Sequence, residues 1–377
     1  MRILIVTNYL PPKIGGIERI SHELASALNT IQGVEVSVAT AIWPTKFVES
    51  EWEEIEYPYE VIDFPCITIF RRLPLPRIFK RSFWVKIKDL DKKFDLVFYQ
   101  SHLFVLNWII AVRLHQVKRR VWMNHGCNYV PLNSKVGIVI SFIYERFGMS
   151  IMKHYCNEFI GQSRNTADWI SSKVDIPFKV LSNATNLKSF HPGKDVVDRK
   201  VRTNVLFVGR LVEGKGVIDC IAAVSKANEI LNLRGDSRLF MLTVVGAGPL
   251  SDQILSLNSN VEIDFRGESS HSKVIDFMCE SDILIQAYSQ PEGLTTVTLE
   301  GLAAGLIIVT TPLSGGQSLK GCVNYLSGEI DDLPDLLLAS RDLPWGRSEL
   351  LASGRGFIEA GFTWDIIAQR LIVGDYS

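Results

Sequence analysis

Two glutamates, Glu292 and Glu300, flank a turn that links a predicted buried strand to a predicted helix. The run Asp282 to Ile285 has the composition of a buried strand, and apolar residues recur at helical spacing from Val297 onward. Ligands of an open α/β sheet bind at the carboxyl ends of its strands, which is where this turn would lie. The two carboxylates are therefore placed to accept hydrogen bonds from the hydroxyl groups of a ligand.

The backbone of the same turn favours an anion. The free amides of Leu294, Thr295 and Thr296, at the start of the predicted helix, would point toward the ligand. A positive helix end between two carboxylates suits a ligand that carries both phosphate and hydroxyl groups, and a sugar nucleotide is such a ligand. A helix with an acidic N-terminus and a solvent-exposed Glu300 is the alternative interpretation.

A second turn supplies positive charge. The predicted strand Asn204 to Val208 is followed by the glycine-framed turn Gly209 to Gly216, which precedes a predicted helix. Within it, Arg210 and Lys215 can both contact one diphosphate, through charge-assisted hydrogen bonds of roughly 1.5–3 kcal/mol each. The turn lacks the GxxxxGK[ST] pattern of a Walker A loop. Two solvent-exposed turn cations are the alternative.

The first half of the chain begins with a βαβ pattern. The predicted strand Arg2 to Thr7 leads into a loop that ends in Gly15-Gly16. These glycines would let a phosphate or hydroxyl approach the backbone closely, and an ordinary turn is the alternative. The loop does not match the GxGxxG fingerprint, which disfavours NAD. Further on, His125 follows the predicted strand Arg120 to Met123. It can hydrogen-bond a sugar hydroxyl there, although a packed loop histidine would show the same pattern.

Composition fits a globular protein of two domains. The chain has 377 residues, of which 47% are apolar. Its six cysteines are scattered and form no CxxC pair, which favours a reducing compartment. No signal peptide is visible, and the longest apolar runs, Leu103 to Val112 and Val136 to Ile143, are shorter than the roughly 18 residues that a membrane span needs. These features predict a cytoplasmic protein.

The charge is unevenly distributed. Residues 1–190 hold 24 Lys+Arg and 17 Asp+Glu, whereas residues 191–377 hold 16 and 24. The segment Arg71 to Lys93 holds nine basic and two acidic residues, with Phe79, Phe83 and Trp84 among them. Such a segment can bind anionic phospholipid at about 1 kcal/mol per basic residue near the surface. A solvated helix face is the alternative, and no base-reading module accompanies it, which disfavours nucleic acid.

Taken together, the order and spacing of the motifs resemble the retaining GT-B glycosyltransferases of family 4, the group 1 glycosyltransferases. The likeness runs nearly from end to end. It rests on Pro11-Pro12 with Gly15-Gly16-Ile17-Glu18-Arg19, Gly209-Arg210-Leu211 with Lys215-Gly216, Gly246-Ala247-Gly248-Pro249-Leu250, Glu292-x7-Glu300 with Ala303-Ala304-Gly305, Gly315-Gly316, and Trp364.

This resemblance implies an α/β fold of the GT-B type, with two Rossmann-like, doubly wound domains that face each other across a cleft. Residues 1–188 would bind the acceptor, residues 189–203 would form the linker, and residues 204–357 would bind the nucleotide sugar. A C-terminal helix, at about residues 358–377, would cross back to the first domain.

The resemblance also implies a role for each candidate residue. Arg210 and Lys215 would neutralise the donor diphosphate and stabilise the leaving group. Glu300 would accept hydrogen bonds from the ribose, and Glu292 would hold the hydroxyls of the transferring sugar. The remaining contacts to sugar, phosphate and acceptor would come from Gly293, Leu294, Thr295, Thr296, His125 and Gly16.

Enzymes of this kind retain the anomeric configuration without an obvious enzymic nucleophile, and two cations can take the place of a metal ion. We therefore expect no metal and no cofactor. The DxD-like string Asp89-Leu90-Asp91 lies in the basic segment before a predicted strand, which argues against a metal site there.

Several positions depart from the family pattern. Thr295 stands where Gly or Pro is common, and Ile307 stands where Pro is usual. Ala184 and Asn186 replace a Gly and an Asp, and the Glu expected after the Gly-Gly pair is missing around Ser318. None of these changes removes Arg210, Lys215, Glu292 or Glu300, so they bear on donor choice and late-loop contacts.

The resulting prediction is a retaining, metal-independent hexosyltransferase that uses a UDP- or GDP-linked sugar. Its acceptor would be a glycan or lipid-linked glycan in surface polysaccharide or lipopolysaccharide-type biosynthesis, at the inner face of the cell membrane. Two alternatives are a nucleotide-sugar epimerase of the same architecture and a catalytically weak scaffold that binds a glycan or a nucleotide.

Overall fold

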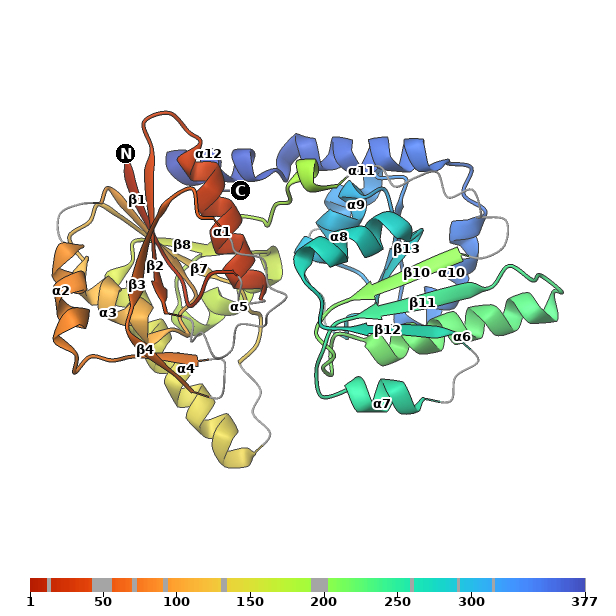
Figure 1. Ribbon diagram of the computed structural model, residues 1–377, viewed down its shortest axis with the longest axis horizontal. Helices are drawn as coiled ribbons and strands as arrows, with labels where there is room; N and C mark the ends of the chain where they lie inside the picture. Colours follow the sequence, from red (N-terminus) through yellow and green to blue (C-terminus); the bar gives the residue numbers. More distant parts are fainter. Residues whose placement is uncertain are drawn as a thin grey trace. The chain divides into compact units, whose positions relative to one another are not determined.

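The computed structural model describes residues 1–11, 15–42, 56–69, 73–90, 94–129, 134–190, 203–257, 261–289, 292–313 and 316–376. The chain folds into two compact units (Figure 1). The first comprises residues 1–182 and 364–377, and the second comprises residues 183–363. Most of the segment predicted as a linker, residues 189–203, lies outside the described residues.

The first unit is built on a parallel sheet with the strand order β3-β2-β1-β6-β7-β8-β9. The strands are β1 (Arg2–Val6), β2 (Glu35–Ala41), β3 (Glu60–Phe64), β6 (Leu96–Gln100), β7 (Arg119–Asn124), β8 (Glu158–Gly161) and β9 (Lys179–Val180). The central strands are apolar runs because helices cover both faces of a parallel sheet. The strand order reverses between β1 and β6, which makes a topological switch point.

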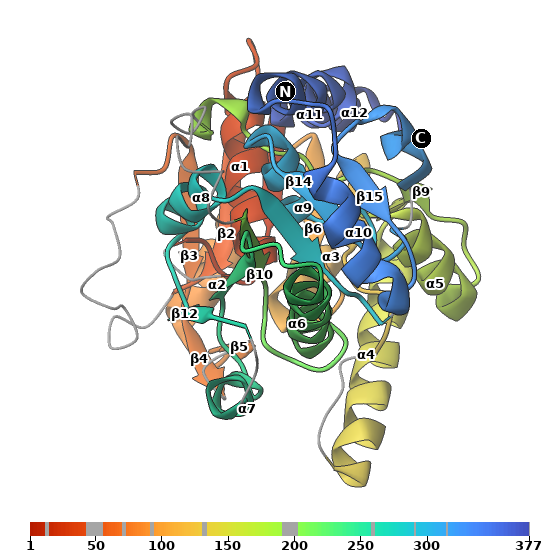
Figure 2. The same cartoon turned by 90° about the vertical axis from the view of Figure 1, so that its right-hand side faces the viewer.

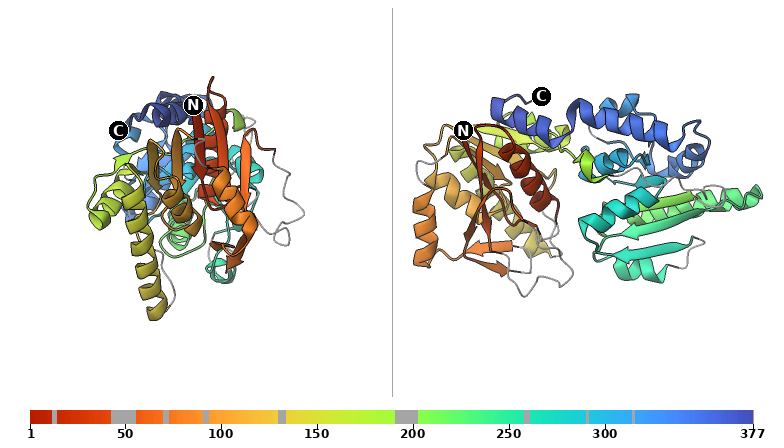
Figure 3. Two further views of the ribbon diagram at one scale, coloured as in Figure 1. Left: turned by 90° about the vertical axis from the view of Figure 1, so that its left-hand side faces the viewer. Right: turned by 45° about the horizontal axis from the view of Figure 1, so that its top comes forward.

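The helices described around this sheet are α1 (Gly16–Asn29), α2 (Arg81–Asp89), α3 (Val105–Arg113), α4 (Lys135–Tyr155), α5 (Arg164–Val174) and α12 (Trp364–Val373). A separate antiparallel pair joins β4 (Cys66–Ile69) to β5 (Leu73–Pro76). The core of the unit is continuous from Leu4 on β1 to Trp122 on β7. Helix α12 packs against α1, although the two are far apart in the sequence (Figure 3).

Helix α2 corrects one expectation about the basic segment. Phe83 is fully buried, and its ring lies 5.4 Å from that of Phe64, so it belongs to the core rather than to a lipid-binding surface. Phe79, by contrast, is 97% exposed, and Trp84 is 46% exposed. The difference follows from helical spacing, because Phe83 and Ile87 share the face that points inward. Residues 71–72 and 91–93 of the segment, including Asp91 of the DxD-like string, lie outside the described residues.

The second unit repeats the architecture with the strand order β12-β11-β10-β13-β14-β15, again parallel. The strands are β10 (Thr203–Val208), β11 (Phe240–Val245), β12 (Ile263–Gly267), β13 (Ile283–Gln286), β14 (Ile307–Thr310) and β15 (Tyr325–Ser327). The helices are α6 (Val217–Leu233), α7 (Ser251–Ser256), α8 (His271–Glu280), α9 (Thr296–Ala303), α10 (Leu333–Arg341) and α11 (Arg347–Gly361). Helices α6 and α10 lie side by side against the sheet (Figure 2).

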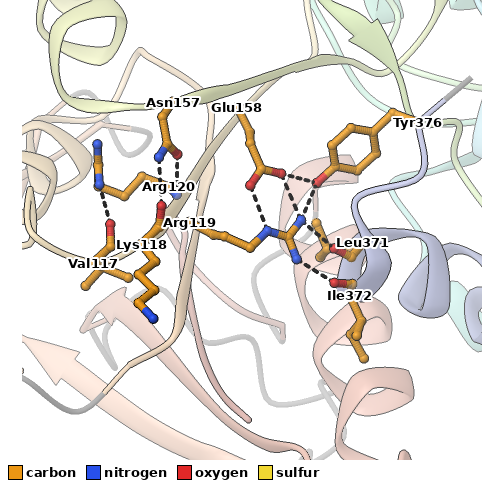
Figure 4. A network of polar contacts seen from close by, with 9 residues as sticks. All are labelled: Val117, Lys118, Arg119, Arg120, Asn157, Glu158, Leu371, Ile372 and Tyr376. Carbon is orange, nitrogen blue, oxygen red and sulfur yellow. Dashed lines mark hydrogen bonds and ion pairs between the residues drawn. The ribbon is translucent and has the colours of Figure 1, made fainter.

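A polar network holds the C-terminal segment on the first unit (Figure 4). The Arg119 guanidinium donates two hydrogen bonds to the Glu158 carboxylate, at 2.7 and 2.8 Å, and a third to the carbonyl oxygen of Leu371 at 3.0 Å. The hydroxyl of Tyr376 donates to the same carboxylate at 2.8 Å. The last described helix, α12, therefore returns to the first unit as expected, but it begins at Trp364, and residues 358–361 belong to α11 of the second unit.

Candidate functional site

The two turns that the sequence singled out meet in the second unit. The Lys215 ammonium lies 2.5 Å from the Glu292 carboxylate, and it lies 5.2 Å from the centre of the Tyr288 ring. Both charged side chains are partly open to solvent, with 25% and 32% of their surface exposed. A ligand can therefore reach this lysine, which a carboxylate and an aromatic face hold in place.

Glycine fixes the lysine. Gly216 caps α6 in the left-handed conformation, with φ at 68°, and a Cβ there would lie 1.6 Å from the carbonyl oxygen of Ala287. The backbone of the turn after β10 thus lies directly against the end of β13. Only glycine permits that approach, and the approach brings Lys215 next to the Glu292 loop.

Arg210 is placed differently from Lys215. Its side chain is exposed, and within the described residues it makes no ion pair or side-chain hydrogen bond. The backbone beside it is well anchored, because the amide of Leu211 donates to the carbonyl oxygen of Ala247 at 3.0 Å. The turn after β10 therefore offers one cation paired inside the site and one that extends into solvent.

Thr295, one of the departures from the family pattern, has a structural role. It is the N-cap of α9, and its hydroxyl accepts a hydrogen bond from the amide of Thr298 at 3.1 Å. The hydroxyl of Thr298 donates in turn to Gln286 at the end of β13. This chain of polar contacts ties the start of α9 to the strand before it. The cap uses the backbone amide of Thr298. The amides of the predicted anion site, at Gly293 to Thr296, precede Thr298 in the chain and take no part in this hydrogen bond.

Glu300 is not solvent-exposed, which answers the alternative raised for it. Its side chain is 4% exposed, and its carboxylate lies 3.0 Å from Nε2 of His271, the first residue of α8. The sequence did not identify His271. The two residues are 29 positions apart, and only the folding of α8 beside α9 brings them together.

His125 and Gly16 lie in the first unit. Nδ1 of His125 is 2.7 Å from the side-chain oxygen of Gln162, and Nε2 is 2.5 Å from that of Gln100. Burial lowers the pKa of His125 to about 4, against a smaller opposite effect of the Gln162 hydrogen bond. A neutral imidazole has one donor and one acceptor, so one of the two glutamines must present its amide NH2 to the ring.

The glutamines were missed because they flank His125 in space and not in sequence. Gln100 ends β6 and Gln162 follows β8, and these strands lie on either side of β7, which precedes His125. Gly16 is the first residue of α1, and a Cβ there would meet no atom of the described chain within 4 Å. Packing among the described residues therefore does not require glycine at this position.

Comparison with known protein families identifies the class and family of this chain. Residues 14–189 match the family described as Glycosyltransferase Family 4, and residues 195–319 match the one described as Glycosyl transferases group 1. The two matches together span much of both units, and the chain is a glycosyltransferase of the GT-B fold. It belongs to the group 1 glycosyltransferases, which confirms the family expected from the motifs.

Individual relatives are distant. An uncharacterized glycosyltransferase of Methanocaldococcus jannaschii is 25% identical over 85% of this chain and 83% of its own length. The phosphatidylinositol N-acetylglucosaminyltransferase GPI3 subunit of Saccharomyces cerevisiae is 23% identical over 98% of this chain and 81% of its own. Among solved structures, Anabaena HepE in complex with UDP-glucose has a TM-score of 0.70 at 14% identity, covering 99% of each chain. At that identity the structural likeness establishes the fold alone.

Proposed function

We propose that this glycosyltransferase takes its sugar from a nucleoside diphosphate sugar bound at the turns after β10 and β13. The pairing of Lys215 with Glu292 carries the proposal, because it puts a diphosphate-binding cation beside a carboxylate that can hold sugar hydroxyls. The HepE structure with UDP-glucose supports this class of donor. A UDP- or GDP-linked hexose is the donor that the prediction names.

The charges at the site suggest a role for each of the two cations, Lys215 and Arg210, in binding the diphosphate. Without ligand, Lys215 and Glu292 neutralise each other. A diphosphate brings negative charge that this pair alone does not balance. The exposed Arg210, which makes no ion pair within the described part of the chain, supplies the missing positive charge. As the sugar bond breaks, charge grows on the leaving diphosphate, and both cations stabilise it more strongly than they stabilise the bound donor.

The carboxylates divide the hydroxyl groups between them. Glu292 lies on the loop beside Lys215, and we assign it to the transferring sugar. Glu300 is buried within α9, where we assign its carboxylate to the ribose hydroxyls, with His271 as the partner that orients it. The amides of Gly293, Leu294, Thr295 and Thr296 complete the phosphate and sugar contacts.

Transfer proceeds with retention in this proposal. The bond between the anomeric carbon and the diphosphate oxygen breaks, and the acceptor oxygen bonds to that carbon on the same face. The acceptor's proton passes to the departing phosphate oxygen, so that neither a metal ion nor an enzymic nucleophile is required. A sugar hydroxyl would bond His125 by replacing one of its two glutamine partners, and Gly16 would leave room for the acceptor.

The acceptor is proposed to be a glycan or lipid-linked glycan at the inner face of a membrane. A relative that matches 98% of this chain is named as a subunit of a phosphatidylinositol N-acetylglucosaminyltransferase, which supports a lipid-linked acceptor. The described part of the basic segment exposes Phe79 and Trp84, which supports contact with anionic lipid. Among the described residues, no helix has both the length and the apolarity to span a bilayer.

Ligand binding and product analysis test the proposal. A nucleotide sugar at 100 times its dissociation constant should stabilise the protein by about 2.7 kcal/mol, which a thermal-shift panel detects. Incubation with that donor and a lipid-linked glycan acceptor should then give a product with the donor's anomeric configuration, read by NMR. An epimerised donor without acceptor would instead identify an epimerase, and donor binding without turnover on any acceptor would identify a scaffold.

A further inference from the structure

Helix α4 carries an unusual apolar surface. Large apolar side chains between residues 136 and 143 are 46–70% exposed, and they are Val136, Ile138, Val139, Ile140, Phe142 and Ile143. Phe147, one turn further on, is also exposed. Isolated exposed apolar residues are normal on protein surfaces, but a contiguous group of this size marks a binding surface.

The helix is firmly anchored in its middle. Gly148 lies so close to the loop after β6 that a Cβ there would be 2.4 Å from the carbonyl oxygen of His102. The hydroxyl of Tyr144 donates to the carbonyl oxygen of Leu103 at 2.6 Å. Residues 134–140, in contrast, are exposed apart from the partly buried Gly137, and this N-terminal end projects beyond the sheet of the first unit (Figures 1 and 2). The contacts of Tyr144 and Gly148 therefore form a rigid base, and the exposed residues 134–140 form an apolar tip that projects from it.

The breadth of the apolar surface argues against a single helical partner. At about 100° per residue, the exposed apolar side chains cover an arc of roughly 200° around α4. A helix that packs against one neighbour presents a stripe of about 100°. An arc twice as wide suits surroundings that contact the helix from several sides, as the acyl chains of a bilayer do.

Charge on the helix has the sign that an anionic membrane requires. Glu145 is the single acidic residue of α4, and it is buried, with its carboxylate accepting from Ser141 and lying 3.4 Å from His102. Lys135, Arg146 and Lys153 are exposed. The exposed surface of α4 is thus apolar with a basic margin, as in helices that lie in membrane interfaces.

We propose that the N-terminal half of α4 inserts its apolar side chains into the surface of an anionic lipid bilayer and holds the first unit there. The base formed with Tyr144 and Gly148 would keep the tip oriented as it enters. This binding adds an apolar, salt-resistant component to the electrostatic one proposed for the segment around α2. It does not depend on the identity of donor or acceptor.

Vesicle flotation tests the inference with a matched pair of variants. Val139→Gln/Ile143→Gln removes two exposed apolar side chains from α4 without adding charge. Leu233→Gln/Leu255→Gln makes the same change at residues of the second unit that are 89% and 65% exposed. Phosphatidylglycerol vesicles should float the natural protein at about 0.1 M salt, and much of the binding should persist at about 1 M, where exposed charges are screened.

The α4 variant should show a partition coefficient at least about tenfold lower at the higher salt, and the control variant should match the natural protein. Lys80→Glu/Arg81→Glu should weaken binding at low salt and leave the salt-resistant part intact. Equal high-salt binding by the α4 variant would overturn the proposal. Failure of the natural protein to float, with a dimer in light scattering that the α4 variant abolishes, would overturn it in favour of a second copy of the chain. Circular dichroism melts verify that each variant is folded.

Discussion

The ammonium group of Lys215 is held in position and is still accessible to a ligand. Glu292 and Tyr288 fix its ammonium group, yet a quarter of the side chain remains exposed, at 25%. If Lys215 stabilises the leaving diphosphate, Lys215→Ala should lower kcat/KM about 10²–10³-fold. This corresponds to an activation free energy raised by about 2.7–4 kcal/mol. Lys226→Ala, on the exposed side of α6, is the matched control and should leave turnover unchanged. Unaltered kinetics in Lys215→Ala would remove the residue from the site.

His125 makes a prediction about pH. Its pKa in the folded protein is lowered to about 4 by burial, whereas an unfolded histidine titrates near 6.5. Between these values the unfolded chain binds more protons, so stability should fall as pH decreases from about 6.5 to about 4. In His125→Gln this part of the pH dependence should disappear. Hydrogen exchange of the β6 and β7 amides reports on it, and the same slope in both proteins would contradict the burial argument.

At the scale of the elements, the turn between β10 and α6 depends on Gly216. Gly216→Ala would combine left-handed strain, about 1–3 kcal/mol, with a clash against the carbonyl oxygen of Ala287. Gly235→Ala is the matched control, because Gly235 has a φ of 69° and no described atom within 4 Å of a Cβ. We expect urea unfolding of the second unit to show the strain in both variants, with a clearly larger loss and weakened donor binding in Gly216→Ala. Equal losses would mean that the close approach has no energetic effect.

The elements also show how far sequence reasoning reaches. The strand-turn-helix units and the turns that carry Lys215 and Glu292 could be predicted, because local composition and glycine spacing determine them. Contacts between separate elements could not, since they depend on strand order and helix packing. Gln100 and Gln162 bond His125 across three neighbouring strands, and His271 reaches Glu300 from another helix. Phe83 was misplaced on the surface because the basic segment was considered as a whole and not by helical face.

For the whole molecule, the network around Arg119 secures the return of the chain to the first unit. Burial alone would raise the pKa of Glu158, but hydrogen bonds from Arg119 and Tyr376, with the charges of Arg119 and Lys179, outweigh it and lower that pKa. A lowered carboxylate pKa stabilises the folded state above the unfolded value of about 4.3, and this stabilisation is lost as pH falls through the folded value.

Arg119→Met should therefore destabilise the first unit at neutral pH by about 1–3 kcal/mol, since the Glu158 carboxylate loses its charged donor. The difference from the natural protein should shrink as pH falls through the lowered pKa of Glu158, because the carboxylate is then protonated in both proteins. Arg164→Met, which breaks an exposed pair with Asp168, should cost less than about 0.5 kcal/mol. Hydrogen exchange in β7 and β8 measures both effects, and a difference that is constant with pH would exclude the carboxylate as its source.

The return of the C-terminal segment also bears on how the chain is made. In sequence, the second unit is an insertion within the first, which takes residues from both ends of the described chain. A ribosome delivers the second unit whole while the first still lacks α12 and Tyr376. During synthesis, Glu158 and Arg119 can form their contacts with Tyr376 only after it is made, and Tyr376 lies 218 and 257 residues after them in the sequence. The first unit, which begins before the second unit in sequence, is thus completed only after it.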